Sequence, residues 1–258
     1  MKTCPSSLLV LLLAFGGTVC AQTTAPVVAE PNPWNLDVGL NYVTGDYGLN
    51  SDTDVWVQTT SLGYESNPWR FEATLPFISL SGPASVIGDV GRADTSTQRG
   101  AGDISLAATY QIVRADAGRG NIDFTARLKL PTADEAKGLG TGETDLNVEF
   151  NYSRNLGEVT PFATLGYRFL GRSPAYPLKD GFYTTMGLAA PVGTDGTTAG
   201  LALTWRAPIV EDADSATELM AFVARRLDDD WKIQGFVLAG FTDASPDFGL
   251  GALVGYKF

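Results

Sequence analysis

The chain has 258 residues, 44% of them hydrophobic, and its 29 glycines and 14 prolines are typical of one sizeable folded domain rather than a disordered or repeat-built chain. The mean hydropathy is only +0.02, and no apolar run of about 18 to 20 residues follows residue 30, which excludes a helical membrane protein. The formal net charge of −11 argues against nucleic acid as a partner.

The first 21 residues have the organisation of a signal peptide. Lys2 supplies a basic start, residues 8–15 (LLVLLLAF) form an apolar stretch, and small residues precede Gln22. We therefore expect export of the chain, with cleavage after Ala21.

Both cysteines, Cys4 and Cys20, lie in this leader, so the exported chain has no disulfide or thiol chemistry. Cys20 as a lipid acceptor is a less favoured alternative, because Val19 is larger than the residue that usually precedes such a cysteine. Without the leader, 17 basic residues stand against 29 acidic ones, a net charge of −12. Residues 22–33, rich in Pro and small residues, are predicted to be a periplasmic lead-in, and residues 34–258 the folded domain.

From residue 34 onward, the chain divides into about twelve segments of roughly ten residues in which apolar and polar residues alternate. Strands of about 9 to 11 residues suit a tilted crossing of a bilayer, and the mean hydropathy stays low because only every second residue faces lipid. We predict an all-β fold, an antiparallel transmembrane up-and-down β-barrel of the bacterial outer-membrane type. The clear strands are 34–45, 69–78, 102–114, 121–130, 144–154, 162–170, 182–190, 197–207 and 248–258, and the alternation is too weak to assign faces in 54–66, 216–227 and 231–241.

The connections between these segments alternate in length. Residues 66–68, 155–158 and 228–230 are short, whereas residues 80–101 and 131–143 are long. Outer-membrane barrels have short periplasmic turns and longer outside loops. An even number of strands then places both termini in the periplasm.

Aromatic residues are expected at both membrane interfaces, where a ring is half in hydrocarbon and half hydrated. One register places two sets of aromatic residues at opposite strand ends. The periplasmic set is Trp34, Tyr64, Trp69, Tyr110, Tyr152, Trp231 and Tyr256, and the outer set is Tyr42, Trp56, Phe77, Tyr167, Phe169, Phe182, Trp205 and Phe241.

Charged residues on the clear strands must face the interior, because a Lys or Arg in contact with lipid at mid-bilayer costs on the order of 2 to 4 kcal/mol. Two interpretations stay open: these charges neutralise one another in a tight interior, or they create a transverse field along a water-filled path. About twelve strands enclose a narrow lumen, since eight are filled by side chains and sixteen leave a wide channel. The candidate lumen and selectivity residues are Arg70, Glu72, Asp103, Asp123, Arg127, Lys129, Asp145, Glu149 and Arg168.

The connection at residues 81–102 is longer than a hairpin requires, and we predict it to be a gating loop. Val86 and Ile87 are its large apolar residues and would anchor it against the wall. Arg92 and Arg99 are its candidate charged contacts. A mobile outside loop is the alternative.

The last residues, ALVGYKF, place apolar residues on one face and end in Phe258. This end resembles the C-terminal signal that the barrel assembly machinery recognises in outer-membrane proteins. We therefore expect that machinery and outer-membrane lipid as partners.

A wider resemblance is carried by RGAGDISLAATYQI (99–112), ARLKLPTADEAKGLGTGETDLNVEFNYSRNLG (126–157), PFATLGYRFLG (161–171) and residues 229–258. These stretches resemble the outer-membrane transporter-like barrels of the family named for the MetA pathway of phenol degradation. The shared motifs are turn and strand signatures. The resemblance implies an outer-membrane location and passage of small, aromatic or hydrophobic compounds, without identifying phenol as the solute.

The chain has no histidine, which outer-membrane phospholipases and omptin proteases require for catalysis, and we expect no enzymatic activity. No cofactor and no metal are implied. The predicted function is passive diffusion of small solutes through a narrow charged lumen. The alternative is a closed structural or adhesive barrel, plugged by its ion pairs, with working extracellular loops.

Overall fold

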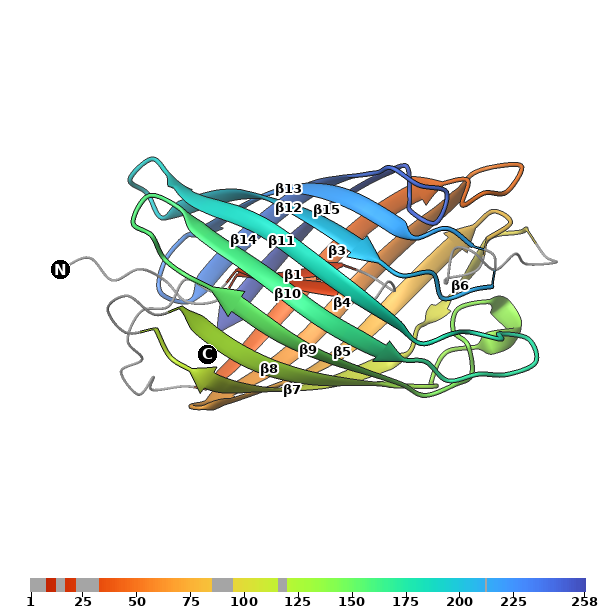
Figure 1. Ribbon diagram of the computed structural model, residues 1–258, viewed down its shortest axis with the longest axis horizontal. Helices are drawn as coiled ribbons and strands as arrows, with labels where there is room; N and C mark the ends of the chain where they lie inside the picture. Colours follow the sequence, from red (N-terminus) through yellow and green to blue (C-terminus); the bar gives the residue numbers. More distant parts are fainter. Residues whose placement is uncertain (1–7, 13–16, 22–32, 85–94, 116–119, 212) are drawn as a thin grey trace.

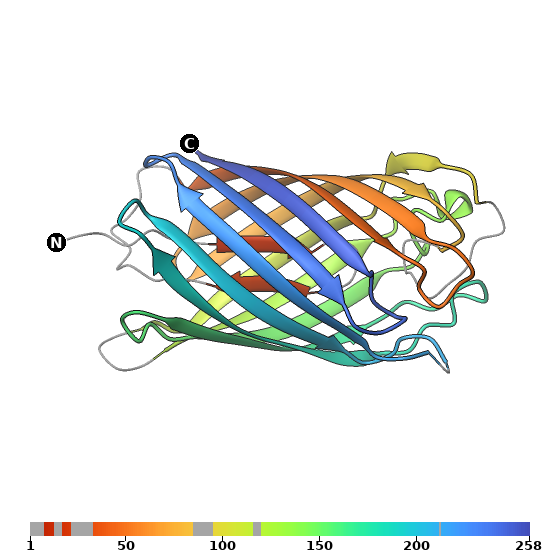
Figure 2. The same ribbon diagram turned by 90° about the horizontal axis from the view of Figure 1, so that it is seen from above.

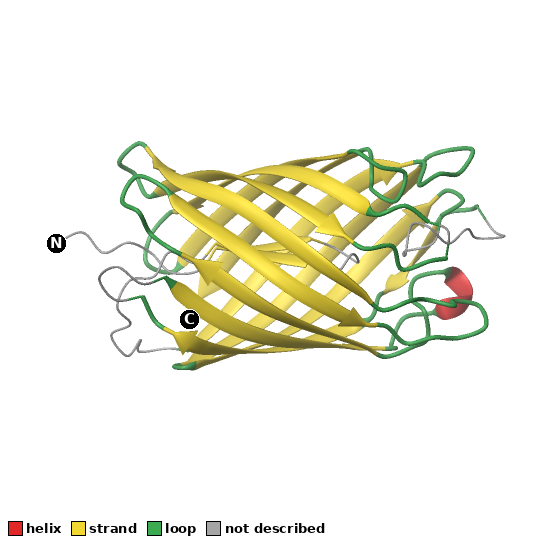
Figure 3. Ribbon diagram, in the orientation of Figure 1, coloured by secondary structure: helices red, strands yellow, loops and turns green. Residues whose placement is uncertain are grey.

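The strands of the protein are tilted and wrap into one barrel, with a short 3-10 helix among the loops at one end (Figures 1 and 3). The computed structural model describes residues 8–12, 17–21, 33–84, 95–115, 120–211 and 213–258. No helix in this part of the chain is long and apolar enough to cross a membrane. The elements are β1 (Leu8–Leu12), β2 (Gly17–Ala21), β3 (Trp34–Gly45), β4 (Thr53–Ser66), β5 (Trp69–Ser81), β6 (Gln98–Ala101), β7 (Ile104–Val113), β8 (Asn121–Leu130), η1 (Glu135–Lys137), β9 (Asp145–Ser153), β10 (Thr160–Phe169), β11 (Gly181–Val192), β12 (Thr197–Arg206), β13 (Ala216–Arg226), β14 (Trp231–Gly240) and β15 (Phe248–Lys257).

Each barrel strand is antiparallel to its neighbours, and the pairing of β15 with β3 closes the sheet. Strands β6 and β7 both pair with β5 and share one position, so twelve strands surround the interior. The predicted antiparallel barrel of the outer-membrane type is confirmed, and the predicted ranges 34–45 and 121–130 coincide with β3 and β8. The remaining strands begin or end within a few residues of their predicted bounds.

One prediction is wrong at β6, because residues 98–101 were expected in a connection and instead extend the sheet. The strand is interrupted where it passes Pro76 of β5, which has no N–H to donate to a ladder. The carbonyl of Pro76 accepts the Gly102 N–H at 2.9 Å. The registers on either side differ by one residue, which is a β-bulge. The bulge directs Asp103 into the barrel.

The two faces of the barrel wall differ in chemistry. Interior side chains are buried and include most strand charges, whereas the outer face exposes a belt of large apolar side chains, as expected for lipid contact. Members of this belt include Val38, Leu40, Leu62, Phe71, Leu75, Phe150, Leu165, Met186, Leu188, Leu201, Leu203, Val223, Val237, Leu250 and Val254.

The three strands without a clear pattern have apolar residues on both faces. In β4, Val55 and Val57 are buried inside while Trp56 is exposed outside. In β13, Met220 and Phe222 face inward. The alternation is blurred there because part of the interior wall is itself apolar.

The aromatic residues predicted at the strand ends form cross-strand pairs. At the end with short turns, Trp34 lies over Tyr64 with ring centroids 4.9 Å apart, and Trp231 lies 4.8 Å from Tyr256. At the opposite end, Tyr42 lies 4.8 Å from Trp56. Aromatic pairs on one face of neighbouring strands stabilise a sheet, so these edge-to-face and tilted pairs support both rims of the barrel.

Strands β1 and β2, which belong to the predicted leader, form a separate two-stranded sheet inside the barrel (Figures 1 and 2). Strand β2 contacts β10 and β11 of the wall. Cleavage before Gln22, which stays a prediction, would remove both strands from the interior.

The exposed apolar belt predicts that the energetic cost of a charge on the outer face depends strongly on its depth in the membrane. Leu165 lies at the middle of β10 and Leu156 in the adjacent turn, and both side chains are well exposed. We expect Leu165→Arg to lower the free energy of unfolding by about 2 to 4 kcal/mol and Leu156→Arg by less than about 1 kcal/mol. Chemical unfolding of both variants in phospholipid vesicles measures the difference, and equal losses would contradict an embedded belt.

Candidate functional site: the barrel interior

Two ion pairs span from β5 to β8 across the intervening strand β7. Arg70 Nη2 lies 3.0 Å from Asp123 Oδ2, and Arg127 Nη1 lies 3.1 Å from Glu72 Oε1. The long side chains reach over β7 because the β7 residues opposite Glu72 and Arg70, Ala107 and Thr109, are small. The sequence-predicted charges on these strands are therefore brought together inside the barrel.

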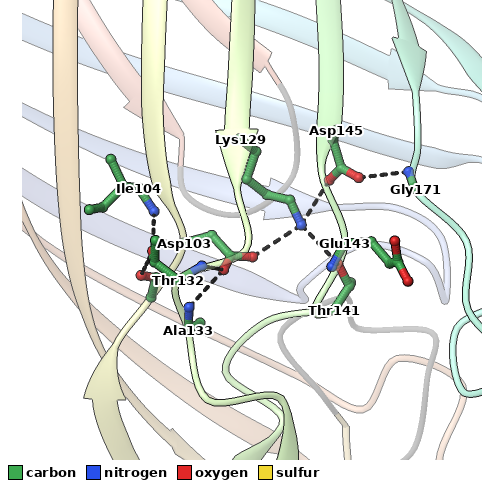
Figure 4. A network of polar contacts seen from close by, with 10 residues as sticks. Asp103, Ile104, Lys129, Thr132, Ala133, Thr141, Glu143, Asp145 and Gly171 are labelled. Atoms are coloured by element: carbon green, nitrogen blue, oxygen red, sulfur yellow. Dashed lines mark hydrogen bonds and ion pairs between the residues drawn. The ribbon is translucent and has the colours of Figure 1, made fainter.

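Lys129 of β8 is the centre of a second network (Figure 4). Its Nζ lies 3.0 Å from Asp103 Oδ2 and 3.0 Å from Asp145 Oδ2. It also donates a hydrogen bond to Thr141 Oγ1 at 2.9 Å. One cation thus joins β8 to the bulge before β7, to β9 and to the connection that follows β8.

The same two carboxylates hold backbone in place. Asp103 Oδ1 accepts the N–H groups of Thr132 at 3.0 Å and Ala133 at 2.9 Å, while Asp145 Oδ1 accepts the N–H of Gly171 at 2.9 Å. Such charge-assisted bonds to backbone are stronger than neutral ones. The network therefore fixes the starts of two loops to the barrel wall.

The loop between β8 and β9, residues 131–144, turns into the mouth of the barrel. Leu139 is almost fully buried and packs against inward side chains of β4 and β5, including Val57, Ile78 and Leu80. A Cβ at Gly140 would lie 2.8 Å from Asp103 Oδ2, so only glycine allows this close approach. Sequence analysis identified residues 131–143 as a long outside loop but missed the burial of Leu139, because one leucine in a polar stretch carries no periodic signal.

The predicted gating residues are placed differently. Val86, Ile87 and Arg92 lie outside the described residues. Arg99 belongs to β6, where its Nε donates to Ser79 Oγ at 3.2 Å, and its side chain is exposed. Residues 131–144 have an anchored position of the kind that sequence analysis expected for residues 81–102, and the gating role of residues 81–102 stays a prediction.

Three further polar contacts complete the charged wall. The Tyr183 hydroxyl donates a hydrogen bond to Glu149 Oε2 at 2.5 Å, and Arg168 Nη2 donates one to the Ala207 carbonyl at 3.3 Å. The side chains of Tyr183 and Arg168 are both buried. Asn151 also donates to Glu149, at 3.2 Å. Glu149 and Arg168 therefore lie in the interior, and their partners in these hydrogen bonds are uncharged.

Two ion pairs were not predicted, because each has one member on a strand whose face could not be assigned. Arg206 makes a bidentate contact with Glu218 of β13, one arm of which, Nη1 to Oε2, is 3.1 Å. Lys232 of β14 lies 2.9 Å from Asp37 Oδ2. The pairing of β12 with β13, and of β14 with β15 and of β15 with β3, brings the members of each pair together.

The cations of several pairs are more accessible than their carboxylates. The Arg70 side chain is 26% exposed against 4% for Asp123, and Lys232 is 28% exposed against 4% for Asp37. Lys129 is 22% exposed, whereas its two acidic partners are at 7% and 11%. The carboxylates are nearly buried, so the accessible part of each of these pairs is its cationic side chain.

An apolar surface covers another part of the interior wall. Inward residues of β10 to β13 form one buried cluster, with Phe236 of β14 packed against it. Phe162 and Phe222 are its largest members, with ring centroids 6.3 Å apart. Four of the interior ion pairs join residues of β5, β8 and β9 and of the bulge before β7, whereas this apolar cluster lies on β10 to β14, which also carry the Arg206–Glu218 pair. The cluster comprises Phe162, Ala189, Ala202, Met220 and Phe222.

Comparison with known proteins relates the chain to solved barrels at the level of fold. No family model and no curated protein matches it. The COG4313 outer membrane channel from Pseudomonas putida F1 is similar over 90% of this chain and 97% of its own, with 15% identity and a TM-score of 0.69. The translocator domain of the autotransporter NalP from Neisseria meningitidis has 12% identity and a TM-score of 0.52 over 89% of this chain and 90% of its own. The CymD monoaromatic hydrocarbon channel has 8% identity and a TM-score of 0.50 over 88% and 89%.

The Lys129 network predicts that one substitution frees the inward loop. Lys129→Gln removes the cation that joins Asp103 to Asp145, so we expect a spin label at Ala136→Cys, an exposed position on the loop, to become more mobile. Electron paramagnetic resonance of the labelled protein measures the change.

The matched control is Lys137→Gln, which breaks an exposed pair with Asp134 on the same loop. Equal label mobility in the two variants would contradict the role of Lys129.

Proposed function

We propose that the protein is a channel of the bacterial outer membrane, through which small solutes diffuse passively. The observation that carries the proposal is the mixed interior, in which ion pairs with partly accessible cationic side chains share the barrel wall with an apolar phenylalanine cluster. The proposal includes removal of β1 and β2 with the signal peptide, which leaves the interior to the mature chain.

The solutes that fit such an interior are small and have an aromatic or hydrophobic part. The apolar cluster offers a surface on which that part is transferred out of water, and the charged wall keeps the rest of the path hydrated. The similarity to a solved monoaromatic hydrocarbon channel supports this assignment through the fold. In this function the protein is no enzyme and needs no cofactor or metal.

The membrane and its assembly machinery are the proposed partners. The exposed apolar belt faces outer-membrane lipid, and the last strand, β15, ends next to Phe258 at the end with short turns. The Phe258 N–H donates to the Trp34 carbonyl at 3.1 Å, so the terminal residue lies beside the strand that closes the barrel. We propose that this end is the assembly signal.

A closed structural barrel is the second candidate, and the inward loop favours it. Residues 131–144 and the Lys129 network narrow the mouth, and the interior ion pairs satisfy one another. In this alternative, the outer loops would be the working surface of the protein.

Conductance separates the two candidates. We expect mature protein, purified from outer membranes and confirmed by intact mass to begin at Gln22, to conduct ions in planar bilayers. Proteoliposomes should admit small solutes and exclude oligosaccharides. A folded barrel that permits neither ions nor solutes to pass would contradict the channel and support the closed barrel.

The Arg127–Glu72 pair predicts the direction in which the ion selectivity changes when Arg127 is replaced. Arg127→Ala removes one positive charge and leaves Glu72 without its cation, so the interior becomes more negative. We therefore expect the cation-to-anion permeability ratio to rise on the order of two-fold. Reversal potentials in a salt gradient measure this ratio, and heat-dependent migration on gels confirms folding.

Arg225→Ala is the matched control, because Arg225 pairs with Asp195 at the barrel rim with both side chains exposed. The same ratio in both variants would contradict a selectivity role for Arg127.

A further inference from the structure

The three phenylalanines of the apolar surface share one geometry with their neighbours. In the strand register, Phe162 is directly opposite Gly187, Phe222 is opposite Gly200, and Phe236 is opposite Gly251. All six residues are on the inward face of their strands. Each interior phenylalanine therefore has a glycine beside it on the next strand.

The rings occupy the space that a side chain on these glycines would need. A Cβ built on Gly187 would lie 2.6 Å from Phe162 Cε2 and 2.5 Å from the Leu201 carbonyl oxygen. One built on Gly200 would lie 2.7 Å from Phe222 Cε1 and 2.6 Å from the Leu188 carbonyl oxygen. On Gly251, the distance to Phe236 Cζ would be 2.7 Å. Real Cβ atoms do not approach other atoms this closely, so each ring lies along the wall over its glycine.

Because the barrel is curved, this arrangement of rings over glycines affects how much of the interior is filled. Inward side chains of a closed sheet converge, and small barrels alternate small and large residues to fit them. A ring that lies over glycine adds its apolar surface to the wall without standing across the narrow interior. If the glycine had a side chain, the ring would have to turn away from the wall, and the free direction is toward the barrel axis.

We propose that Gly187, Gly200 and Gly251 determine the bore and the size limit of the channel by holding three phenylalanine rings flat against its wall. This proposal rests on the proposed channel function. It assigns a specificity role to residues that have no side chain to contact a solute.

A double-substitution cycle at Phe162 and Gly187 tests the proposal. We expect Gly187→Ala to lower single-channel conductance and the rate of solute entry into proteoliposomes by about two-fold or more, because the displaced ring fills part of a narrow lumen. Phe162→Ala should raise both. In the Phe162→Ala background, the Gly187→Ala change should lower both much less, since no ring remains to be displaced and only the Leu201 carbonyl oxygen stays close to the added Cβ.

Gly235→Ala in β14 is the matched control, because the nearest atom to its added Cβ is 3.6 Å away, which is ordinary contact. It should leave conductance unchanged. Should Gly187→Ala fail to fold, the same cycle at Phe222 and Gly200 replaces it.

The outcomes separate the two levels of inference. A conducting native protein whose conductance is unchanged by Gly187→Ala, or lowered equally with and without Phe162, overturns the role of the glycines and leaves the channel intact. A native protein that does not conduct overturns both.

Discussion

The pairing of β15 with β3 closes the sheet, and the chemistry of the two barrel faces depends on that closure. A closed sheet pairs its strands on both sides, which is the condition for β-structure in hydrocarbon, where an unpaired peptide group has no water to bond. Closure also divides side chains between an outer face that meets lipid and an inner face with limited space. The exposed leucines outside and the buried ion pairs inside are two consequences of one constraint.

Small inward residues leave room for the large side chains of the narrow interior. The β7 residues opposite Glu72 and Arg70 are small, which lets these two side chains reach partners on β8. On the opposite part of the wall, glycines leave room for phenylalanine rings to lie flat. Small residues thus allow both a charged and an apolar surface to exist in one narrow interior, and the contrast between these surfaces is the physical basis of the proposed transport.

The fold by itself does not select a function. Solved barrels with similar folds include outer-membrane channels and an autotransporter translocator domain, at identities of 15% or less. What distinguishes this chain is the content of its interior and the loop anchored in its mouth. Lys129 links these two features, because it belongs to the charged wall and also binds Thr141 of the inward loop.

Local alternation by itself determined most of the fold. It determined the class of barrel, the bounds of β3 and β8 and the inward placement of Arg127 and Lys129, because strand geometry places successive side chains on opposite faces. It could not determine the faces of β4, β13 and β14, where Val57, Phe222 and Phe236 make the interior apolar too. The pairs Arg206–Glu218 and Lys232–Asp37, the burial of Leu139 and the placement of each ring over a glycine were decided only by the tertiary structure. These contacts depend on register between neighbouring strands, a property that no single strand contains.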